Sequence, residues 1–203
     1  MSLRSAFNKK DPAHLFKAVQ NRDLDRIRKF WRDNGDMNAK DKSGNTALIL
    51  AAGLGHKDVV RVLLSFSANV NAKNNDSDSA LLLASYKGYT DIVQLLLDYN
   101  ADIKAANGKQ TPSLSVAARE GHEAVVRLLL GNKADVNTKD NSHDTALIYA
   151  AKNGHEGIVR LLLDHKADVN AKNEDGDNAL LWVTSNGYEG IAQILIKHGA
   201  DLN

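Results

Sequence analysis

The sequence predicts an all-α solenoid of about six stacked helix-turn-helix units with β-turn tips. The first observation is a period of 33 residues, which places glycine at Gly55, Gly88, Gly121, Gly154 and Gly187. The second is a short apolar pattern at helical spacing on both sides of each of these glycines. A helix pair this short cannot bury its own apolar face, so only a stack of pairs is stable.

The period divides the chain into a short extension and one domain. Residues 1–7 form an N-terminal extension, and residues 8–203 form a single repeat domain. The terminal units differ from the others, as caps with one neighbour should. The predicted units are the N-terminal cap 8–40, the internal units 41–73, 74–106, 107–139 and 140–172, and the C-terminal cap 173–203.

The fifth unit illustrates the elements of each repeat in chain order. Polar residues 140–144 predict a turn, and Thr145 can cap the following helix by accepting a backbone N–H. Residues 146–151 form a short first helix, which Gly154 ends with a left-handed backbone. Residues 156–163 form the second helix, whose apolar side packs into the stack.

The fourth unit departs from this pattern at its first helix. Thr111 and Pro112 stand one residue earlier than the corresponding capping position in the pattern. We therefore expect Thr111 to cap the helix and Pro112 to occupy its first turn, where proline is tolerated. The helix would then begin earlier than in the other units.

The composition excludes several classes of protein. Of 203 residues, 43% are apolar and 25% are charged, which is ordinary for a globular domain and unlike a disordered chain. No apolar stretch approaches the ~18 residues of a membrane span, and the N-terminal residues lack the apolar centre of a secretory signal. The absence of cysteine removes disulfides and fits a cytoplasmic location.

Several motifs recur in register. They include Gly55-His56 and Gly121-His122, the Ala-Asp-Val-Asn strings at 134–137 and 167–170, and the run Asp-Lys-Ser-Gly-Asn-Thr-Ala-Leu at 41–48. With these motifs the chain resembles the ankyrin-repeat family over residues 8–203. The resemblance implies a protein-binding module whose concave groove is lined by the β-turn tips and the ends of the first helices.

Family members close the second helix of each unit with glycine, and this chain mostly does not. Ser67, Asn100, Lys133 and Lys166 stand at that position, and only Gly199 keeps the glycine. A non-glycine residue with positive φ costs roughly 1 kcal/mol. The sequence therefore predicts strained residues at the ends of four helices.

The resemblance also implies the residues that contact a partner. They belong to the tips and to the groove-side ends of the first helices, and they vary from unit to unit while the apolar framework repeats. The predicted partner-binding residues are Lys42, Ser43, Asn45, Leu54, Asp76, Asp78, Tyr86, Lys87, Lys109, Arg119, Glu120, Asn141, Asp144, Lys152, Asn153, Asp175 and Asp177.

Tyr86 and Arg119 are the predicted hot spot of this surface, because aromatic and arginine side chains carry a large share of binding energy. Asp76 with Asp78 and Asp175 with Asp177 make acidic patches, whereas the middle is basic through Lys109, Arg119, Lys139 and Lys152. A partner of mixed charge is therefore expected. Tyr149 and Trp182 occupy equivalent first-helix positions, which favours a place in the core, with an aromatic anchor for a partner as the alternative.

No catalytic, cofactor or metal site is predicted. Nucleophile motifs, phosphate-binding glycine loops and metal-ligand spacings are all missing from the sequence. His122 and His155 lie one repeat apart, and packed helices are ~8–10 Å apart, so the two cannot easily share a zinc ion with ~2 Å bonds. We interpret both, together with His56, as structural residues of the turn between helices.

The predicted function is binding of a partner protein or peptide by a cytoplasmic monomer without enzymatic activity. One alternative is a structural or scaffold fragment of a longer protein, and another is a designed repeat protein without a natural partner. A third is nucleic-acid binding by the first unit, since residues 1–40 hold ten Lys and Arg against five Asp and Glu. Aspartates interleave with those cations, and this weakens the nucleic-acid alternative.

Overall fold

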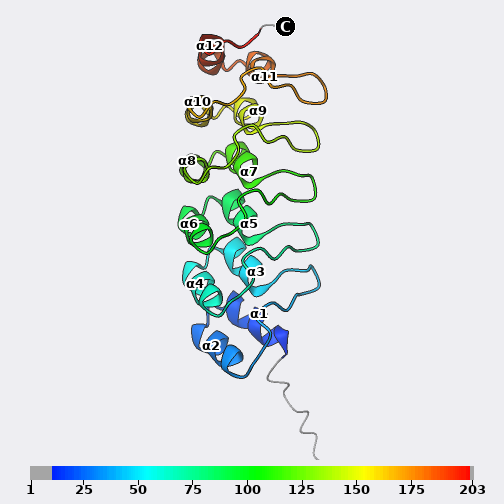
Figure 1. Ribbon diagram of the computed structural model, residues 1–203, viewed down its shortest axis with the longest axis vertical. Helices are drawn as coiled ribbons and strands as arrows, with labels where there is room; N and C mark the ends of the chain where they lie inside the picture. The colour runs from blue at the N-terminus through cyan, green and yellow to red at the C-terminus, as the bar shows by residue number, and fades with distance from the viewer. Residues whose placement is uncertain (1–10, 202–203) are drawn as a thin grey trace, which may run out of the picture.

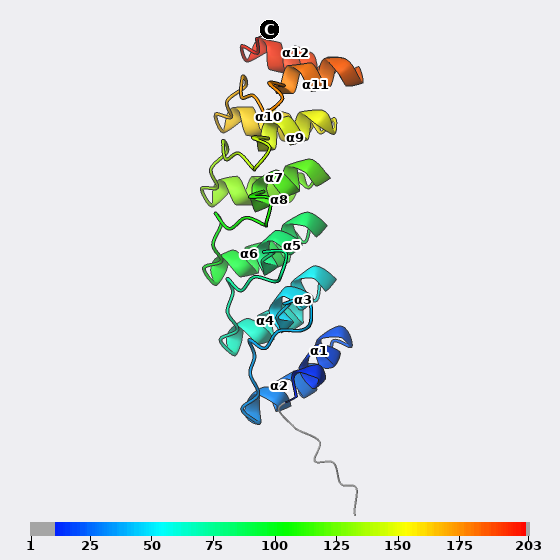
Figure 2. The same cartoon turned by 90° about the vertical axis from the view of Figure 1, so that its right-hand side faces the viewer.

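Twelve helices follow one another in pairs along residues 11–201, the part of the chain that the computed structural model describes. Odd-numbered helices form an inner row, even-numbered helices an outer row, and the loops between pairs project beyond the inner row (Figure 1). Seen from the side of these loops, successive pairs lie above one another along one axis (Figure 2). The helices are α1 Pro12–Gln20, α2 Leu24–Arg32, α3 Ala47–Leu54, α4 Lys57–Ser65, α5 Ala80–Lys87, α6 Thr90–Asp98, α7 Ser113–Glu120, α8 Glu123–Gly131, α9 Ala146–Lys152, α10 Glu156–Asp164, α11 Ala179–Asn186 and α12 Glu189–Lys197.

This arrangement confirms the predicted all-α solenoid of six helix pairs. Each inner helix packs on its own outer partner and on the next inner helix. Within residues 11–201 β-pairing is confined to isolated bridges such as Lys40 with Thr46 at the base of a loop. The predicted extension, residues 1–7, lies outside the described residues. No helix in the described part of the chain has the length and apolar character needed to span a bilayer.

Polar side chains cap most inner helices at their N-termini. In α3, α5, α9 and α11 the capping oxygen accepts the backbone N–H three residues further on, at 2.9–3.3 Å. The capping residues are Thr46, Ser79, Thr145 and Asn178. The prediction for Thr145 is therefore confirmed.

The prediction for the fourth unit is wrong. Pro112 is the cap residue itself, and α7 begins at Ser113, in the same register as the other inner helices. The reason is the loop that precedes the helix. Pro112 has the extended φ of −77° and ψ of 163° of the other caps, and it pairs with Ala106 across the base of the loop. Thr111 therefore lies before the cap, and α7 has no side-chain cap hydrogen bond.

The turn between the helices of a pair requires glycine for two reasons. Gly88 and Gly121 have φ of +73° and +80°, in the left-handed region that side chains disfavour. An added Cβ would also lie 2.6 Å from the His122 ring and 2.7 Å from the His155 ring, respectively. Each ring belongs to the following repeat, so consecutive repeats approach each other closely at this turn.

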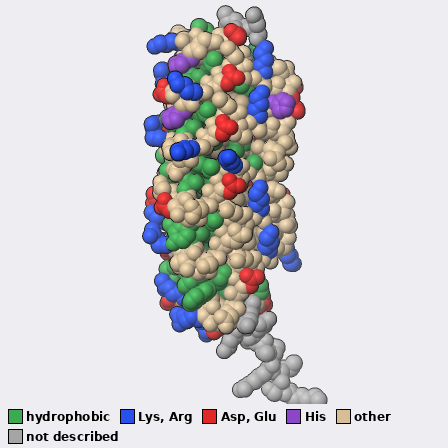
Figure 3. All heavy atoms as spheres, in the orientation of Figure 1, with side chains coloured by type: hydrophobic (Ala, Val, Ile, Leu, Met, Phe, Trp, Pro, Cys, Tyr) green, Lys and Arg blue, Asp and Glu red, His purple; other side chains and the backbone are tan. Residues whose placement is uncertain are grey.

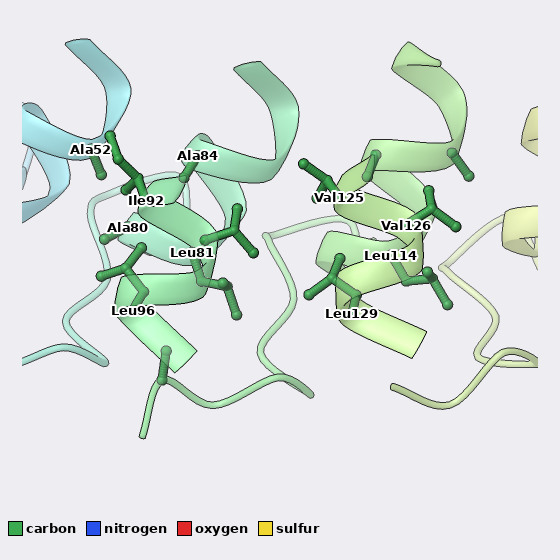
Figure 4. Close-up of a cluster of buried hydrophobic side chains, with 14 of the residues drawn as sticks. Ala52, Ala80, Leu81, Ala84, Ile92, Leu96, Leu114, Val125, Val126 and Leu129 are labelled. Atoms are coloured by element: carbon green, nitrogen blue, oxygen red, sulfur yellow. The ribbon is translucent and has the colours of Figure 1, made fainter. Parts of the chain in front are cut away.

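The core runs without interruption through the stack. The inner-helix leucines at one fixed position are at most 3% exposed in the five repeats from residue 41 onward; they are Leu48, Leu81, Leu114, Leu147 and Leu180. In Figure 4, Leu81 and Leu96 of one pair lie beside Leu114 and Leu129 of the next. Burying each such side chain contributes ~1.5–3 kcal/mol, so the stacking contacts stabilise short helices that could not stand alone.

Candidate functional site

The projecting loops, here called tips, comprise residues 41–45, 74–78, 107–111, 140–144 and 173–177. In each tip the first side chain, an Asp or Asn, accepts two backbone N–H groups of the same loop. Asp140 Oδ1, for example, lies 3.0 Å from the nitrogens of both Ser142 and Asp144. Asp and Asn favour such turns because their short side chains replace backbone acceptors, so each tip has a fixed local shape.

Backbone hydrogen bonds connect each tip to the next. The amides of Asn75, Gly108, Asn141 and Glu174 donate to carbonyls of the preceding tip at 2.9–3.1 Å. The accepting residues are Ser43, Asp76, Lys109 and Ser142. These bonds join the five tips into one edge whose side chains have defined relative positions.

The inner helices end beside this edge with exposed side chains. Leu54 is 43% exposed and Tyr86 is 39% exposed. The Lys87 ammonium lies 5.0 Å from the centre of the Tyr86 ring. The Tyr86 carbonyl oxygen is 2.9 Å from His122 Nε2, the geometry of an N–H donor, so the next repeat holds the backbone of Tyr86 in place.

Arg119 is fixed in the same way one repeat later. Its carbonyl oxygen lies 3.0 Å from His155 Nε2, and its guanidinium Nε lies 2.8 Å from Glu120 Oε1. The guanidinium also sits 5.9 Å from the centre of the Tyr149 ring. The structure therefore pairs Arg119 with Glu120 and Tyr149, while Tyr86 is paired with Lys87.

Tyr149 and Trp182 are not core residues, and the prediction that placed them there is wrong. Both are half-buried, and Lys152 Nζ lies 3.9 Å from the centre of the Trp182 ring. The Tyr149 hydroxyl donates to the buried Asp140 carboxylate at 2.6 Å. Their shared position on the inner helices was visible in the sequence, but the cation over each ring comes from the preceding repeat and depends on the stacking.

Three groups on this surface have shifted pKa values. Burial, assisted by the charge of Asp76, raises the pKa of Asp78 above its ordinary value. Burial also raises the pKa of Asp144, although a hydrogen bond from Asn173 and the charge of Lys152 oppose the shift. Burial and the bond to Asp140 raise the pKa of Tyr149, which therefore stays protonated at neutral pH.

The predicted partner-binding residues are all solvent-accessible, being either exposed or half-buried. Asp76, Asp78 and Lys109 line a surface recess of 490 Å³ between two tips. Arg119 and Lys152 lie beside the aromatic rings of α9 and α11, and the charge of Lys152 reaches Asp144 on the tip. The remaining predicted residues belong to the tips and inner-helix ends described above: Lys42, Ser43, Asn45, Asn141, Asn153, Asp175 and Asp177.

Three arginines of the basic first repeat are paired with aspartates. Arg22 lies 2.8 Å from Asp58 of the next repeat, and Arg26 and Arg28 each lie 3.1 Å from an aspartate of their own repeat. Acidic and basic side chains alternate along the face drawn in Figure 3 instead of gathering at one end. Neither observation favours a nucleic-acid surface.

Comparison with known proteins agrees with the architecture. The family described as ankyrin repeats, in three copies, matches residues 15–107 and again residues 114–203. A search of the curated proteins finds no match. The matched segments include most of the chain, and within the helix stack they leave out only the start of α1 and residues 108–113. With a 33-residue period, six stacked helix pairs and this match, the chain belongs to the ankyrin repeat family.

Proposed function

We propose that the protein is a non-catalytic module that binds a partner protein or peptide through its tip-side surface, which comprises the five tips and the C-terminal ends of the inner helices. Ankyrin repeats generally serve in protein–protein interaction. One observation carries the assignment to this surface: at equivalent positions the side chains differ from repeat to repeat, whereas the backbone has the same conformation. At one position the repeats have Gly53, Tyr86, Arg119, Lys152 and Ser185.

The mechanism is preorganisation. Tip-to-tip hydrogen bonds and the histidine contacts at Tyr86 and Arg119 fix the backbone beneath the binding side chains. Because little ordering remains to be done on binding, less conformational entropy is lost when the partner arrives. Tyr86 and Arg119 would supply the central contacts, and the charged tip residues would mainly affect the association rate.

Half-buried aromatic rings extend this surface toward the C-terminus. Tyr149 and Trp182 each present a ring beneath a cation, Arg119 or Lys152. A partner carrying both acidic and apolar side chains would satisfy the cations and cover the rings. We further infer that the protein acts as a cytoplasmic monomer, since its lack of cysteine suits a reducing compartment.

A capture experiment with matched double variants tests the proposal. The wild-type protein, Tyr86→Ala/Arg119→Ala and the control Tyr99→Ala/Arg61→Ala are used as baits in lysate of the source organism. The control removes one exposed tyrosine and one exposed arginine outside the tip-side surface, and Tyr99 is 41% exposed against 39% for Tyr86. We expect a specific prey to be lost at least tenfold with the first pair and retained with the control.

The opposite pattern would contradict the proposal. If both double variants lose the prey equally, or if only the control loses it, the binding site lies elsewhere. Circular dichroism of each bait confirms that the substitutions leave the helices folded. A prey captured by wild-type protein is then titrated as a purified protein, with affinity as the readout.

A further inference from the structure

The joint between repeats 74–106 and 107–139 differs from the other joints of the stack. A joint is here the contact between two consecutive repeats. Side-chain hydrogen bonds that recur at the other joints are missing from this one among the described residues, and two buried hydroxyls stand at its centre.

The first missing contact belongs to an asparagine ladder on the loops that follow the outer helices. At four joints an asparagine Oδ1 accepts a backbone N–H of the next repeat at 2.7–2.8 Å. The four asparagines are Asn38, Asn71, Asn137 and Asn170. The corresponding residue at the joint in question is Lys104, and no side chain of the described residues replaces the acceptor. The backbone of Lys104 keeps the local bond to Asp102 that the asparagines also make, so only the side-chain contact is lost.

A lysine contact is missing two residues later. Lys40, Lys73 and Lys139 each donate from Nζ to the carbonyl oxygen 33 residues further on, at 2.7–3.1 Å. The residue at this position in repeat 74–106 is Ala106, which has no donor to offer. Lys104 and Ala106 therefore make neither of the two polar contacts that Asn71 and Lys73 make one repeat earlier.

The tips show the same difference. Side chains of neighbouring tips are hydrogen-bonded between Asn74 and Asn45 at 3.0 Å and between Asn173 and Asp144 at 3.1 Å. Within residues 11–201 no such bond joins Asn107 to Asp78, the corresponding pair at this joint. The recess of 490 Å³ lies between these same two tips.

Two buried serines lie at this joint, one on each of the two repeats. A position that is buried in the internal repeats but exposed in the last repeat must be covered by the following repeat. Ser85 occupies such a position, because its counterpart Thr184 is exposed. Ser113 faces the preceding repeat, because its counterpart His14 in the first repeat is exposed. Both hydroxyls are buried and without a hydrogen-bond partner. At the joints on either side, alanine occupies both positions, as Ala52 with Ala80 illustrates.

Within residues 11–201, apolar packing and two polar contacts remain at this joint. The Gly108 amide donates to the Asp76 carbonyl at 3.0 Å, and His122 contacts the Tyr86 carbonyl at 2.9 Å. Figure 4 shows the leucines of both repeats side by side. In a solenoid, stability is approximately a sum of repeat and joint terms, so a weakened joint is where cooperativity fails first.

We propose that the array is divided at this joint into two cooperative blocks, residues 11–106 and 107–201, which open independently of each other. The two hydroxyls lose hydrogen bonds with water on burial, and no side-chain hydrogen bond among the described residues of this joint compensates for that loss of stability. The division does not depend on the proposed binding function. If the tip-side surface does bind a partner, contacts to Tyr86 and Arg119 would link the two blocks.

Site-resolved hydrogen exchange on the full chain tests the division. Leu162 of α10 is fully buried, and Leu162→Ala should raise the opening constant of its own block at least about 30-fold. We expect this increase for amides of residues 107–201 and no change for those of residues 11–106. The equivalent change Leu63→Ala should do the reverse. Equal acceleration of both blocks by either variant would overturn the proposal.

A repair variant supplies the second arm. Lys104→Asn/Ala106→Lys restores the contacts of the neighbouring joints, and Ser85→Ala/Ser113→Ala removes the orphan hydroxyls. Each restored hydrogen bond should strengthen coupling about fivefold. In the repaired background Leu162→Ala should accelerate exchange in residues 11–106 as well. If its effect still stops at residue 106, these residues do not set the boundary and the proposal is wrong.

A control variant removes the same two side-chain contacts at the next joint. Asn137→Lys/Lys139→Ala copies the residues found at positions 104 and 106, and it should confine the effect of Leu162→Ala to residues 140–201. Leu162→Val serves as a milder probe if the alanine variant unfolds its block entirely. Spread of the effect through residues 107–139 in this control would contradict the role assigned to the missing contacts.

Discussion

Single residues with positive φ place a measurable strain on the outer helices. Lys166 directly follows the C-cap of α10 and has φ +68°, as expected from its position in the repeat. A side chain in this region destabilises the folded state by ~1–2 kcal/mol. Glycine removes this strain, but its greater freedom in the unfolded chain offsets ~0.4–1 kcal/mol of the gain. We therefore expect Lys166→Gly to stabilise residues 140–172 by up to ~1 kcal/mol, measured from hydrogen exchange of the α10 amides.

The control for this prediction is a lysine with helical backbone angles. Lys17 is exposed within α1, where glycine should cost ~1 kcal/mol of helix stability. A gain at Lys17→Gly, or a loss at Lys166→Gly, would show that backbone strain is not the deciding factor at position 166.

The Asp144 carboxylate gives a pH-dependent contribution to stability. Because burial raises its pKa in the folded state above 3.8, the folded protein binds more protons than the unfolded chain just above that pH. Stability is therefore lost as the pH rises through the folded-state pKa. Asp144→Asn removes this charge and keeps the acceptor for Asn173, as Asn45 does for Asn74.

We expect Asp144→Asn to be more stable than wild type at pH 7 by roughly 0.2–1 kcal/mol, the usual size of charge effects near a surface. The difference should shrink toward zero as the pH falls to 3.8. Exchange of the α9 amides between pH 4 and 7 provides the measurement. A gain of constant size over this range would mean that charge is not its cause.

At the scale of elements, glycine in the turn between paired helices avoids both backbone strain and a clash with the following repeat, and the two effects can be measured separately. Gly121 and Gly187 have nearly the same φ, +80° and +75°, but only Gly121 has a ring of the following repeat against it. Gly187→Ala should therefore cost the ~1–2 kcal/mol of backbone strain alone. Gly121→Ala should cost more, because the His155 ring must move and its contact with the Arg119 carbonyl is lost.

Hydrogen exchange of the helices that flank each turn measures both losses. Adding His155→Ala to each variant then tests the assignment by a double-mutant cycle. The extra loss at Gly121→Ala should disappear in that background, while the loss at Gly187→Ala stays unchanged. Equal losses for the two glycine variants would mean that strain alone requires glycine at these turns.

At the scale of the whole molecule, the period made most of the fold predictable. A feature that recurs every 33 residues identifies helices, caps and turns together, and one correct repeat then supplies the others. The error at Pro112 arose from applying a local capping rule to a residue whose loop already fixes the register. Local rules fail where non-local pairing determines the backbone.

Contacts between repeats were much less predictable than the repeats themselves. The ladder of asparagines, the lysine contacts and the cations over Tyr149 and Trp182 join residues about 30 positions apart, and their geometry exists only in the assembled stack. The sequence identified the tips as variable, but it could not show which side chains meet there. The joint after residue 106 differs from the others in contacts between repeats, which no single repeat contains.

The backbone hydrogen bonds between tips also fix the spacing of the tips along the edge. Tips recur at the interval of packed helices, ~8–10 Å, and their amide-to-carbonyl links hold that interval along the edge. An extended chain advances ~3.3 Å per residue, so three of its residues span one interval. A flexible segment laid along the edge would therefore meet a new tip at every third residue, and its spacing of side chains would matter as much as their chemistry.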